Sequence, residues 1–357
     1  MTGIWWQYVA IFLGALSACI VLTPVALWIA LRGEMFDRPG GHKSHDSPVP
    51  YLGGLAIVTA FAVSVIVAGA VDAPPEGTGE LRVVLGLALV LALTGLVDDL
   101  KSLTPLLRFV PQLGCALGVW WLGEGVSITQ VEVIDLGITI FWLVGITNAF
   151  NLLDNMDGLS AGIAGIVSLT FFAVAAANGQ YLVAGLSIAL AGCSFGFLPR
   201  NFYPASIFMG DGGSLFLGFL IGYLGLKLRF DSPMSRSFVV PILVCTPAVL
   251  DTTVAVCSRL WYRRNPLLGG QDHVSHRLLK IGLPVPIVVW ATYFVTAAIG
   301  VISFVVARVD AASGWVLTGL VFFFLITAAA LAWLVPVYPE SKQRHFVIAE
   351  NGRPPKQ

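Results

Sequence analysis

The chain has 357 residues, of which 57% are hydrophobic and only 11% are charged, and its formal net charge at pH 7 is zero. Soluble domains carry about 25% charged residues, so this composition excludes a soluble globular protein and indicates a polytopic membrane protein. The balanced charge gives no sign of a nucleic-acid partner. The five cysteines contain no Cys-x-x-Cys pair, so we expect buried thiols rather than a disulfide framework.

Eleven apolar segments are long enough to cross a bilayer, since a spanning helix needs about 20 residues. In chain order they cover residues 4–31, 51–71, 81–98, 104–123, 134–153, 157–177, 181–198, 213–230, 237–260, 285–307 and 314–336. The first has no basic flank and is too long for a signal-peptide core, so we expect it to be retained. The sequence predicts an all-α polytopic membrane protein, with one catalytic domain over 1–338 and a polar tail over 339–357.

Basic residues are distributed unequally between alternate loops. Fifteen of the 20 Lys and Arg residues fall on one side, in 32–50, 98–108, 148–157, 199–212, 259–284 and 337–357. The positive-inside rule makes that side cytoplasmic, with the N-terminus outside and the C-terminus in the cytoplasm.

The polar clusters of the chain fall on the same side. They are Asp37–Gly54, Asp98–Lys101, Asn148–Ser160, Phe208–Ser214 and Asp272–Lys280. Because a translocation path would distribute polar groups through the membrane, this arrangement predicts one active site at the cytoplasmic interface.

The segment Asn148–Ser160 carries the strongest signal. Asn148, Asn151, Asp154 and Asp157 are each three residues apart, which stacks them along one face of a helix. Gly158 would then let the backbone leave the helix. Ionisable groups at membrane depth usually line a cavity or substrate path, and oxygen ligands suit Mg²⁺ and phosphate. The alternative is a polar turn between two helices.

Two further clusters contain acids. The adjacent carboxylates Asp98 and Asp99 need a nearby cation, for which Mg²⁺, Lys101 or Arg108 are candidates. Asp211 lies in a glycine-rich stretch before an apolar helix, where backbone N–H groups favour phosphate. The alternatives are a solvated helix end for the first cluster and an ordinary N-cap for the second.

Basic groups complete the set. His273, His276 and Arg277 have the spacing of a pyrophosphate clamp, with histidine donating as imidazolium. A zinc site lacks further ligands here, and charge that only fixes topology is the remaining alternative. Lys43 and His45 of the first loop could contact the same phosphates. Asp251 lies inside a predicted span and is left outside the predicted site.

Together these clusters resemble the polyprenyl-phosphate N-acetylhexosamine-1-phosphate transferase family, the superfamily of MraY, WecA and TagO in glycosyltransferase family 4. The resemblance runs from about Asp37 to Gly282, with five motifs in the family's order. They are His42-Lys43 through Gly53-Gly54, Val97-Asp98-Asp99, Asn148–Leu159, Phe208-Met209-Gly210-Asp211 and Asp272-His273…His276-Arg277-Leu278.

The resemblance implies a role for each matching residue. Asn151 and Asp211 would coordinate Mg²⁺, for which Mn²⁺ could substitute. The implied catalytic carboxylates are Asp98, Asp99, Asp154 and Asp157. The implied substrate-binding residues are Lys43, His45, Asn148, His273, His276 and Arg277.

The implied reaction is attack by undecaprenyl phosphate on the β-phosphorus of a UDP-N-acetylhexosamine, with GlcNAc the sugar expected first. UMP leaves, and the lipid pyrophosphoryl sugar stays in the bilayer of the bacterial inner membrane. Whether Asp98 acts as a base stays open, because a phosphate monoester is already ionised near neutral pH. A homodimer, the sugar and the envelope polymer (cell wall, O-antigen or capsule) also stay open.

Two departures from the family pattern bear on the branch. Two residues separate His273 from His276 where several members have a tighter run, and Asn155 stands where many have glycine. The first favours the WecA and TagO branch over the MraY branch, which uses UDP-muramoyl-pentapeptide. The rival readings are a secondary transporter, which would place polar groups at the midplane, and a non-catalytic lipid-binding homologue.

Overall fold

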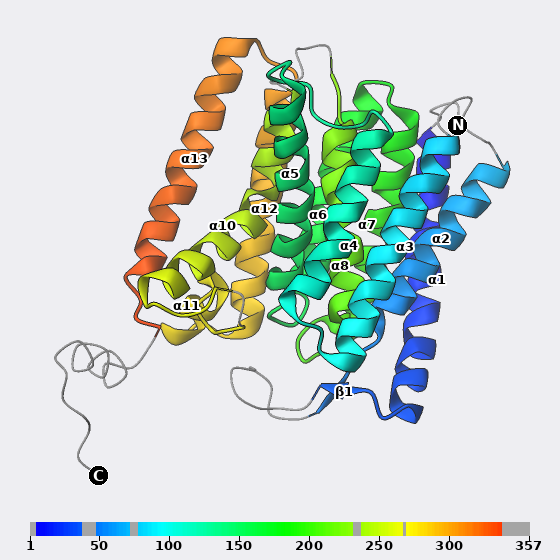
Figure 1. Ribbon diagram of the computed structural model, residues 1–357, viewed down its shortest axis with the longest axis vertical. Helices are drawn as coiled ribbons and strands as arrows, with labels where there is room; N and C mark the ends of the chain where they lie inside the picture. The colour runs from blue at the N-terminus through cyan, green and yellow to red at the C-terminus, as the bar shows by residue number, and fades with distance from the viewer. Residues whose placement is uncertain (1–4, 38–47, 72–77, 231–236, 267–268, 338–357) are drawn as a thin grey trace.

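The computed structural model describes residues 5–37, 48–71, 78–230, 237–266 and 269–337 (Figure 1). Within these ranges the chain forms twelve helices and one two-stranded sheet. The helices are α1 (Trp5–Arg32), α2 (Gly53–Val71), α3 (Thr78–Lys101), α4 (Pro105–Trp121), α5 (Glu132–Leu153), α6 (Leu159–Ala177), α7 (Tyr181–Asn201), α8 (Gly210–Lys227), α10 (Val239–Trp261), α11 (Val274–Lys280), α12 (Val285–Val306) and α13 (Ala311–Trp333). The predicted all-α architecture is confirmed.

Each of the eleven predicted spans has a long helix as its counterpart, and α11 is a short additional helix. Nine helices of the described chain are long and apolar enough to cross a bilayer. The other two long helices are α4, with 17 residues, and α8, which begins with the polar, glycine-rich run Gly210–Ser214. Nearly all of α8 is buried, because it packs against α2, α3, α5, α6, α7 and α10. Other helices, rather than lipid, therefore surround α8.

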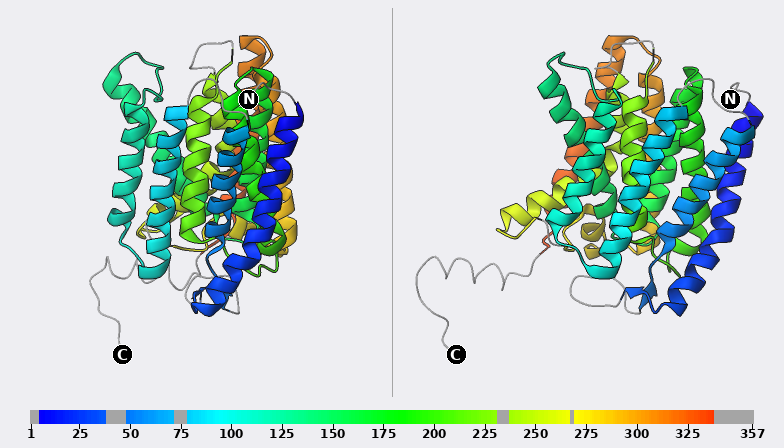
Figure 2. Two further views of the ribbon diagram at one scale, coloured as in Figure 1. Left: turned by 90° about the vertical axis from the view of Figure 1, so that its right-hand side faces the viewer. Right: turned by 45° about the vertical axis from the view of Figure 1, so that its right-hand side comes forward.

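The helices run roughly along one axis, so the chain alternates between two ends of a bundle (Figures 1 and 2). In Figure 1, α1 begins at the upper end and α13 finishes at the lower end, as an odd number of spans requires. The connections α1–α2, α3–α4, α5–α6 and α7–α8 all lie at the lower end, and so does α11. The polar clusters predicted to share one face therefore do share one end of the bundle.

A small sheet closes the lower end near α1. Strands β1 (Phe36–Asp37) and β2 (Val49–Pro50) pair antiparallel, with Phe36 opposite Pro50 and Asp37 opposite Val49. A parallel bridge between Tyr51 and Phe208 then joins this loop to the segment that leads into α8. The predicted ligands Lys43 and His45 lie between the two strands, outside the described residues.

Candidate active site

A cavity of about 400 Å³ opens at the lower end of the bundle, where α3, α5, α8 and the segment before α11 meet. It is lined by Asp37, Tyr51, Asp99, Asn151, Leu152, Asp154, Asn155, Met156, Asp157, Asn201, Phe208, Gly210, Asp211, Gly269, Gly270, His273 and His276. The structure therefore brings together predicted site residues from four separate polar clusters. We refer to Asp99, Asn151, Asp154, Asp157 and Asp211 as the acidic wall, and to residues 272–277 as the histidine segment.

The first turn of α8 is fixed by a carboxylate from α3. Asp99 Oδ1 accepts a hydrogen bond of 2.9 Å from the Asp211 N–H, and its Oδ2 accepts one of 3.2 Å from the Gly212 N–H. These are N–H groups that a helix start leaves without partners, and the negative charge also suits the helix dipole. Asp99 therefore positions Asp211 while lining the same cavity.

Two glycines allow this close approach. A Cβ at Gly95 of α3 would lie 2.2 Å from the Asp211 carbonyl oxygen, and a Cβ at Gly210 would lie 2.5 Å from an Asp99 carboxylate oxygen. Gly210 also has a φ of 72°, a left-handed conformation that glycine adopts without penalty. The glycines of this motif therefore serve helix packing in the described structure.

Asp98 is not among the residues that line the cavity, although its side chain lies beside that of Asp211. Its carboxylate accepts a hydrogen bond from the Leu103 N–H at 2.6 Å and forms an ion pair of 3.0 Å with Arg108, and its exposed fraction is 6%. The same Arg108 nitrogen lies 3.4 Å from Asp211 Oδ2. Of the two candidate side chains, Lys101 and Arg108, Arg108 is thus the one that pairs with Asp98.

The Asn-rich segment divides between a helix and a turn. α5 ends at Leu153, five residues before Gly158, so Asp154 and Asp157 lie beyond the helix that was expected to stack them. Gly158, with a φ of 77°, instead precedes the first turn of α6. Asp157 is held to the α7–α8 connection, because its Oδ2 accepts a 2.8 Å hydrogen bond from the Ala205 N–H. The turn, rather than a helical face, aims these carboxylates into the cavity.

Asn148 does not line the cavity. Its amide nitrogen donates to Gln112 Oε1 of α4 and, at 2.8 Å, to the Val144 carbonyl. Asn148 therefore links α5 to α4, one turn before the site begins.

Asn151 and Asp211 form the centre of the acidic wall. The Asn151 amide nitrogen donates to Asp211 Oδ1 at 2.8 Å and to Ser214 Oγ at 2.9 Å. A carboxylate can only accept, so the amide nitrogen must point toward Asp211. This leaves the Asn151 amide oxygen for the cavity.

Carboxylates outnumber cations along the cavity. Five of them line it, the four of the acidic wall and Asp37, and no Lys or Arg of the described chain does. Burial, and then the negative charges of Asp99 and Asp157, raise the pKa of the Asp154 carboxyl to about 7. A site built in this way favours a bound cation, because a cation would relieve the repulsion among the carboxylates.

The donor set fits Mg²⁺. Among the described residues no three His, Cys, Asp or Glu side chains form a ready-made metal cage. Mg²⁺ typically takes one or two carboxylates and keeps its other positions for water and substrate phosphates. Asp211 and the Asn151 amide oxygen suit such a partial coordination shell.

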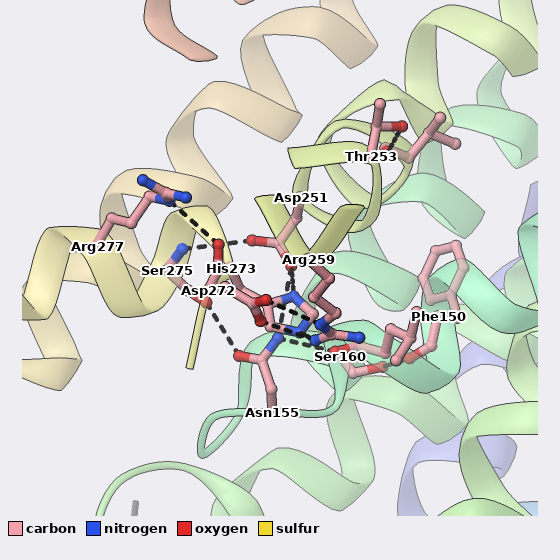
Figure 3. A network of polar contacts seen from close by, with 12 residues as sticks. Phe150, Asn155, Ser160, Asp251, Thr253, Arg259, Asp272, His273, Ser275 and Arg277 are labelled. Carbon is pink, nitrogen blue, oxygen red and sulfur yellow. Dashed lines mark hydrogen bonds and ion pairs between the residues drawn. The ribbon is translucent and has the colours of Figure 1, made fainter. Parts of the chain in front are cut away.

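His273 and His276 of the histidine segment form a second wall of the cavity, and a buried network holds this segment (Figure 3). Arg259 donates to both oxygens of Asp272, at 2.9 and 2.8 Å, and these side chains are 2% and 0% exposed. His273 lies between Arg259, 3.2 Å from its Nε2, and Asp251, 2.6 Å from its Nδ1. The network therefore fixes the start of the histidine segment from both sides.

Arg277 is also buried, but it contacts the end of α13 rather than the cavity. Its guanidinium donates to the carbonyls of Ala332, Trp333 and Val335, at 3.4, 3.2 and 2.7 Å, and to Ser258 Oγ at 2.9 Å. These carbonyls end α13, where a cation also suits the helix dipole. Arg277 does not line the cavity, so the structure does not bring it to the predicted clamp.

His276 does line the cavity and is 6% exposed. Burial is the largest cause that lowers the pKa of this ring, to about 4. His276 is therefore neutral near pH 7, rather than the imidazolium that the sequence suggested. Its Nδ1 is buried and has no hydrogen-bond partner in the described part of the protein.

Sequence reasoning missed three members of the network: Asp251, Asn155 and Arg259. Asp251, 5% exposed, accepts from His273, and Asn155 accepts a 3.0 Å hydrogen bond from Ser275 Oγ. The available signal was an acid within an apolar span, which is costly unless it has a specific partner. No local pattern identified its partner, which is 22 residues away in the chain.

Comparison with known proteins agrees with this geometry. Residues 81–229 match the sequence profile of "Glycosyl transferase family 4". The chain is 32% identical, over 91% of both chains, to a probable undecaprenyl-phosphate N-acetylglucosaminyl 1-phosphate transferase of Bacillus subtilis. It is 32% identical to a decaprenyl-phosphate N-acetylglucosaminephosphotransferase of Mycolicibacterium smegmatis, over 75% of both chains. It is 35% identical to a phospho-N-acetylmuramoyl-pentapeptide-transferase of Moorella thermoacetica, over 71% of this chain and 86% of the relative.

The match to the Bacillus subtilis protein covers 91% of this chain. Together with the profile match, it confirms the resemblance that the five motifs indicated. The chain is a multi-pass membrane protein that belongs to glycosyl transferase family 4, the superfamily of polyprenyl-phosphate N-acetylhexosamine-1-phosphate transferases.

Proposed function

We propose that this protein transfers N-acetylhexosamine-1-phosphate, with GlcNAc as the sugar, from a UDP-sugar to undecaprenyl phosphate in the bacterial inner membrane. The observation that carries the proposal is the acidic wall. Four carboxylates and an amide converge on one cavity at one end of a bundle of apolar helices. The activities named for the Bacillus subtilis and Mycolicibacterium smegmatis relatives support the same chemistry.

The position of the cavity suits one lipid and one soluble substrate. A lipid phosphate lies at the membrane interface, and the cavity opens at the end of the bundle where the basic loops of the chain gather. By the positive-inside rule this end faces the cytoplasm, where nucleotide sugars are made. Positive charge around the opening would also attract the anionic nucleotide sugar.

In the proposed reaction, an oxygen of the lipid phosphate attacks the β-phosphorus of the UDP-sugar. The bond from that phosphorus to the bridging oxygen breaks, and UMP carries that oxygen away. Phosphoryl transfer depends mainly on positioning and charge neutralisation. When bound, Mg²⁺ supplies the neutralisation of the phosphate charges.

The protein's own groups divide the remaining work. Asp211 and the Asn151 amide oxygen would hold the ion, and Asp99 keeps Asp211 in place through the first turn of α8. Asp154 and Asp157 complete the wall from the α5–α6 turn. Asp98 pairs with Arg108 and is not among the residues that line the cavity, so we assign it to support of the site rather than to accepting a proton from the lipid phosphate. That phosphate is already ionised near neutral pH and needs no base.

The test is UMP release by purified protein in detergent, with undecaprenyl phosphate, Mg²⁺ and UDP-GlcNAc. We expect release that requires the lipid phosphate and stops when EDTA removes the metal. Substituting UDP-muramoyl-pentapeptide tests the activity named for the Moorella thermoacetica relative, and faster release with that donor would move the proposal to the MraY branch. No release with any of several UDP-sugars by folded protein would contradict the transferase and favour a transporter or a non-catalytic homologue.

A further inference from the structure

The two ring nitrogens of His273 face groups of opposite character (Figure 3). Nδ1 lies 2.6 Å from the Asp251 carboxylate, and Nε2 lies 3.2 Å from a terminal nitrogen of Arg259. A carboxylate only accepts hydrogen bonds and a guanidinium only donates them. The partners therefore assign the proton to Nδ1 and the lone pair to Nε2, as a hydrogen-bond network can do when hydrogens are not seen directly. A doubly protonated ring would set a second N–H against the Arg259 cation.

Arg259 cannot turn away from His273 without losing other contacts. Its Nε and Nη2 bind both oxygens of Asp272, and its Nη1 donates to the Pro266 carbonyl at 3.1 Å. Such a two-point pair fixes the plane of the guanidinium as well as its position. The cation that faces His273 is therefore a fixed part of the fold.

Asp251 fixes the Nδ1 side of the His273 ring. It projects from α10, and its Oδ1 accepts from the Ser275 N–H at 3.3 Å while its Oδ2 receives His273. The Asn155 amide nitrogen lies 3.5 Å from the same Oδ2, and the Asn155 amide oxygen accepts from Ser275 Oγ at 3.0 Å. One buried carboxylate thus joins α10, the histidine segment and the α5–α6 turn, which holds two members of the acidic wall.

His276 differs from its neighbour. The two rings lie 5.8 Å apart between centroids, and both line the cavity. Both nitrogens of His273 are already engaged, whereas His276 forms no hydrogen bond with the described residues and its Nδ1 is buried without a partner. Of the two rings, only His276 can therefore offer a nitrogen to a ligand without breaking an existing contact.

We propose that Asp251 is a positioning residue for the transfer reaction. With Arg259 it holds His273 as the neutral Nδ1–H tautomer, so that His273 is a fixed wall of the cavity and His276 is the histidine that meets the diphosphate of the nucleotide sugar. The role in transfer rests on the proposed function. The tautomer and its cause do not, because they follow from the contacts alone.

The direct test is ¹⁵N NMR of protein that carries labelled histidine, reconstituted in lipid. The chain has five histidines, and loss of a signal in His273→Gln and in His276→Gln assigns the two rings. In the wild-type protein we expect a protonated Nδ1 and an unprotonated Nε2 for His273. A doubly protonated His273, or a proton on Nε2, would overturn the proposal without any variant of Asp251.

Asp251→Asn then tests the cause. An asparagine that still accepts from Ser275 with its oxygen presents an N–H to His273 Nδ1, while Arg259 still donates toward Nε2. Neither tautomer then satisfies both partners, so we expect the single Nδ1–H form of His273 to be replaced by a mixture of the two tautomers. Thr253→Val is the matched control on the same helix, because the Thr253 hydroxyl only donates to its own helix at Val249. An unchanged His273 tautomer in Asp251→Asn overturns the assignment to Asp251.

Kinetics separate positioning from general loss of structure. Carboxylates that orient a ligand-binding histidine commonly affect function by about 10- to 100-fold, so we expect a rise of about tenfold in KM for the nucleotide sugar in Asp251→Asn. The KM for the lipid phosphate should stay unchanged, and Asp251→Glu should recover part of the loss. An equal change in both KM values would contradict positioning. If the wild-type protein shows the predicted tautomer but releases no UMP, the proposed transferase activity is wrong. The role of Asp251 in transfer is then wrong as well.

Discussion

The two walls of the cavity treat charge in opposite ways. The acidic wall places four carboxylates around one space, and Arg108 pairs with one of them, Asp211. At the histidine segment, by contrast, the buried cations Arg259 and Arg277 are paired with acceptors. Uncompensated charge is costly to bury and is therefore a sign of a missing ligand, while a paired and hydrogen-bonded charge fixes geometry. The difference indicates that the carboxylates of the acidic wall bind the substrates and their metal, whereas Arg259 and Arg277 stabilise the fold.

The largest effect should come from the acidic wall. We expect Asp211→Asn to lower UMP release by roughly 1,000-fold or more, because it removes a negative metal ligand at the reacting phosphates. The melting temperature should change little, since asparagine keeps the shape and a hydrogen bond to Asn151. Asp310→Asn is the control, an acid at the start of α13 that contacts only Ser313 in its own first turn. Near-normal release by Asp211→Asn would remove Asp211 from the site.

The next effect concerns the fold. Arg277→Ala should destabilise the protein by about 3 kcal/mol, because it leaves one buried and two part-buried carbonyls at the end of α13 without this donor. The melting temperature in detergent measures this loss, and KM for the nucleotide sugar should stay near that of the wild type. Arg277→Lys should not restore stability, since an ammonium lacks the planar fork. A stable variant with a strongly raised KM would return Arg277 to the diphosphate clamp.

A smaller effect is the pH dependence of stability without metal. The pKa of the Asp154 carboxyl is about 7 in the folded protein and about 4 in an unfolded chain. Between these values the folded state binds more protons than the unfolded state, so stability should fall as pH rises from about 4 to 7. We expect Asp154→Asn to remove on the order of 2 kcal/mol of that fall, after allowance for partial exposure.

The measurement for Asp154 is unfolding in EDTA at a series of pH values. Saturating Mg²⁺ should reverse the trend, because a bound cation favours the ionised carboxylates. An equally steep fall in wild type and Asp154→Asn would show that another group is responsible.

The smallest effect lies where the two walls meet. The hydrogen bond of 3.0 Å between Ser275 and Asn155 crosses from the histidine segment to the α5–α6 turn. A double-mutant cycle of Asn155→Ala and Ser275→Ala should give a coupling energy of about 1 kcal/mol in stability. Additive losses would show that the two walls are held independently.

Local sequence identified every member of the acidic wall. Asp99, Asn151, Asp154, Asp157 and Asp211 were all predicted from polar groups interrupting apolar runs, and the structure places all five around one cavity. The inference worked because polar side chains at membrane depth have few purposes. It was less successful for Asp98, Asn148 and Arg277, since a motif shows that a residue is polar but not which way its side chain points.

The sequence by itself determined that the chain is an all-α membrane protein, where its spans lie, and which loops share an end. Those properties follow from hydropathy and from the alternation of direction in successive helices. Only the tertiary structure decided which charges are open and which are paired. The partners of His273 come from α10, 22 and 14 residues away, and three carbonyl partners of Arg277 come from the end of α13, more than 50 residues away. Which charged side chains pair depends on their distance in the folded structure, and a local sequence pattern does not contain that distance.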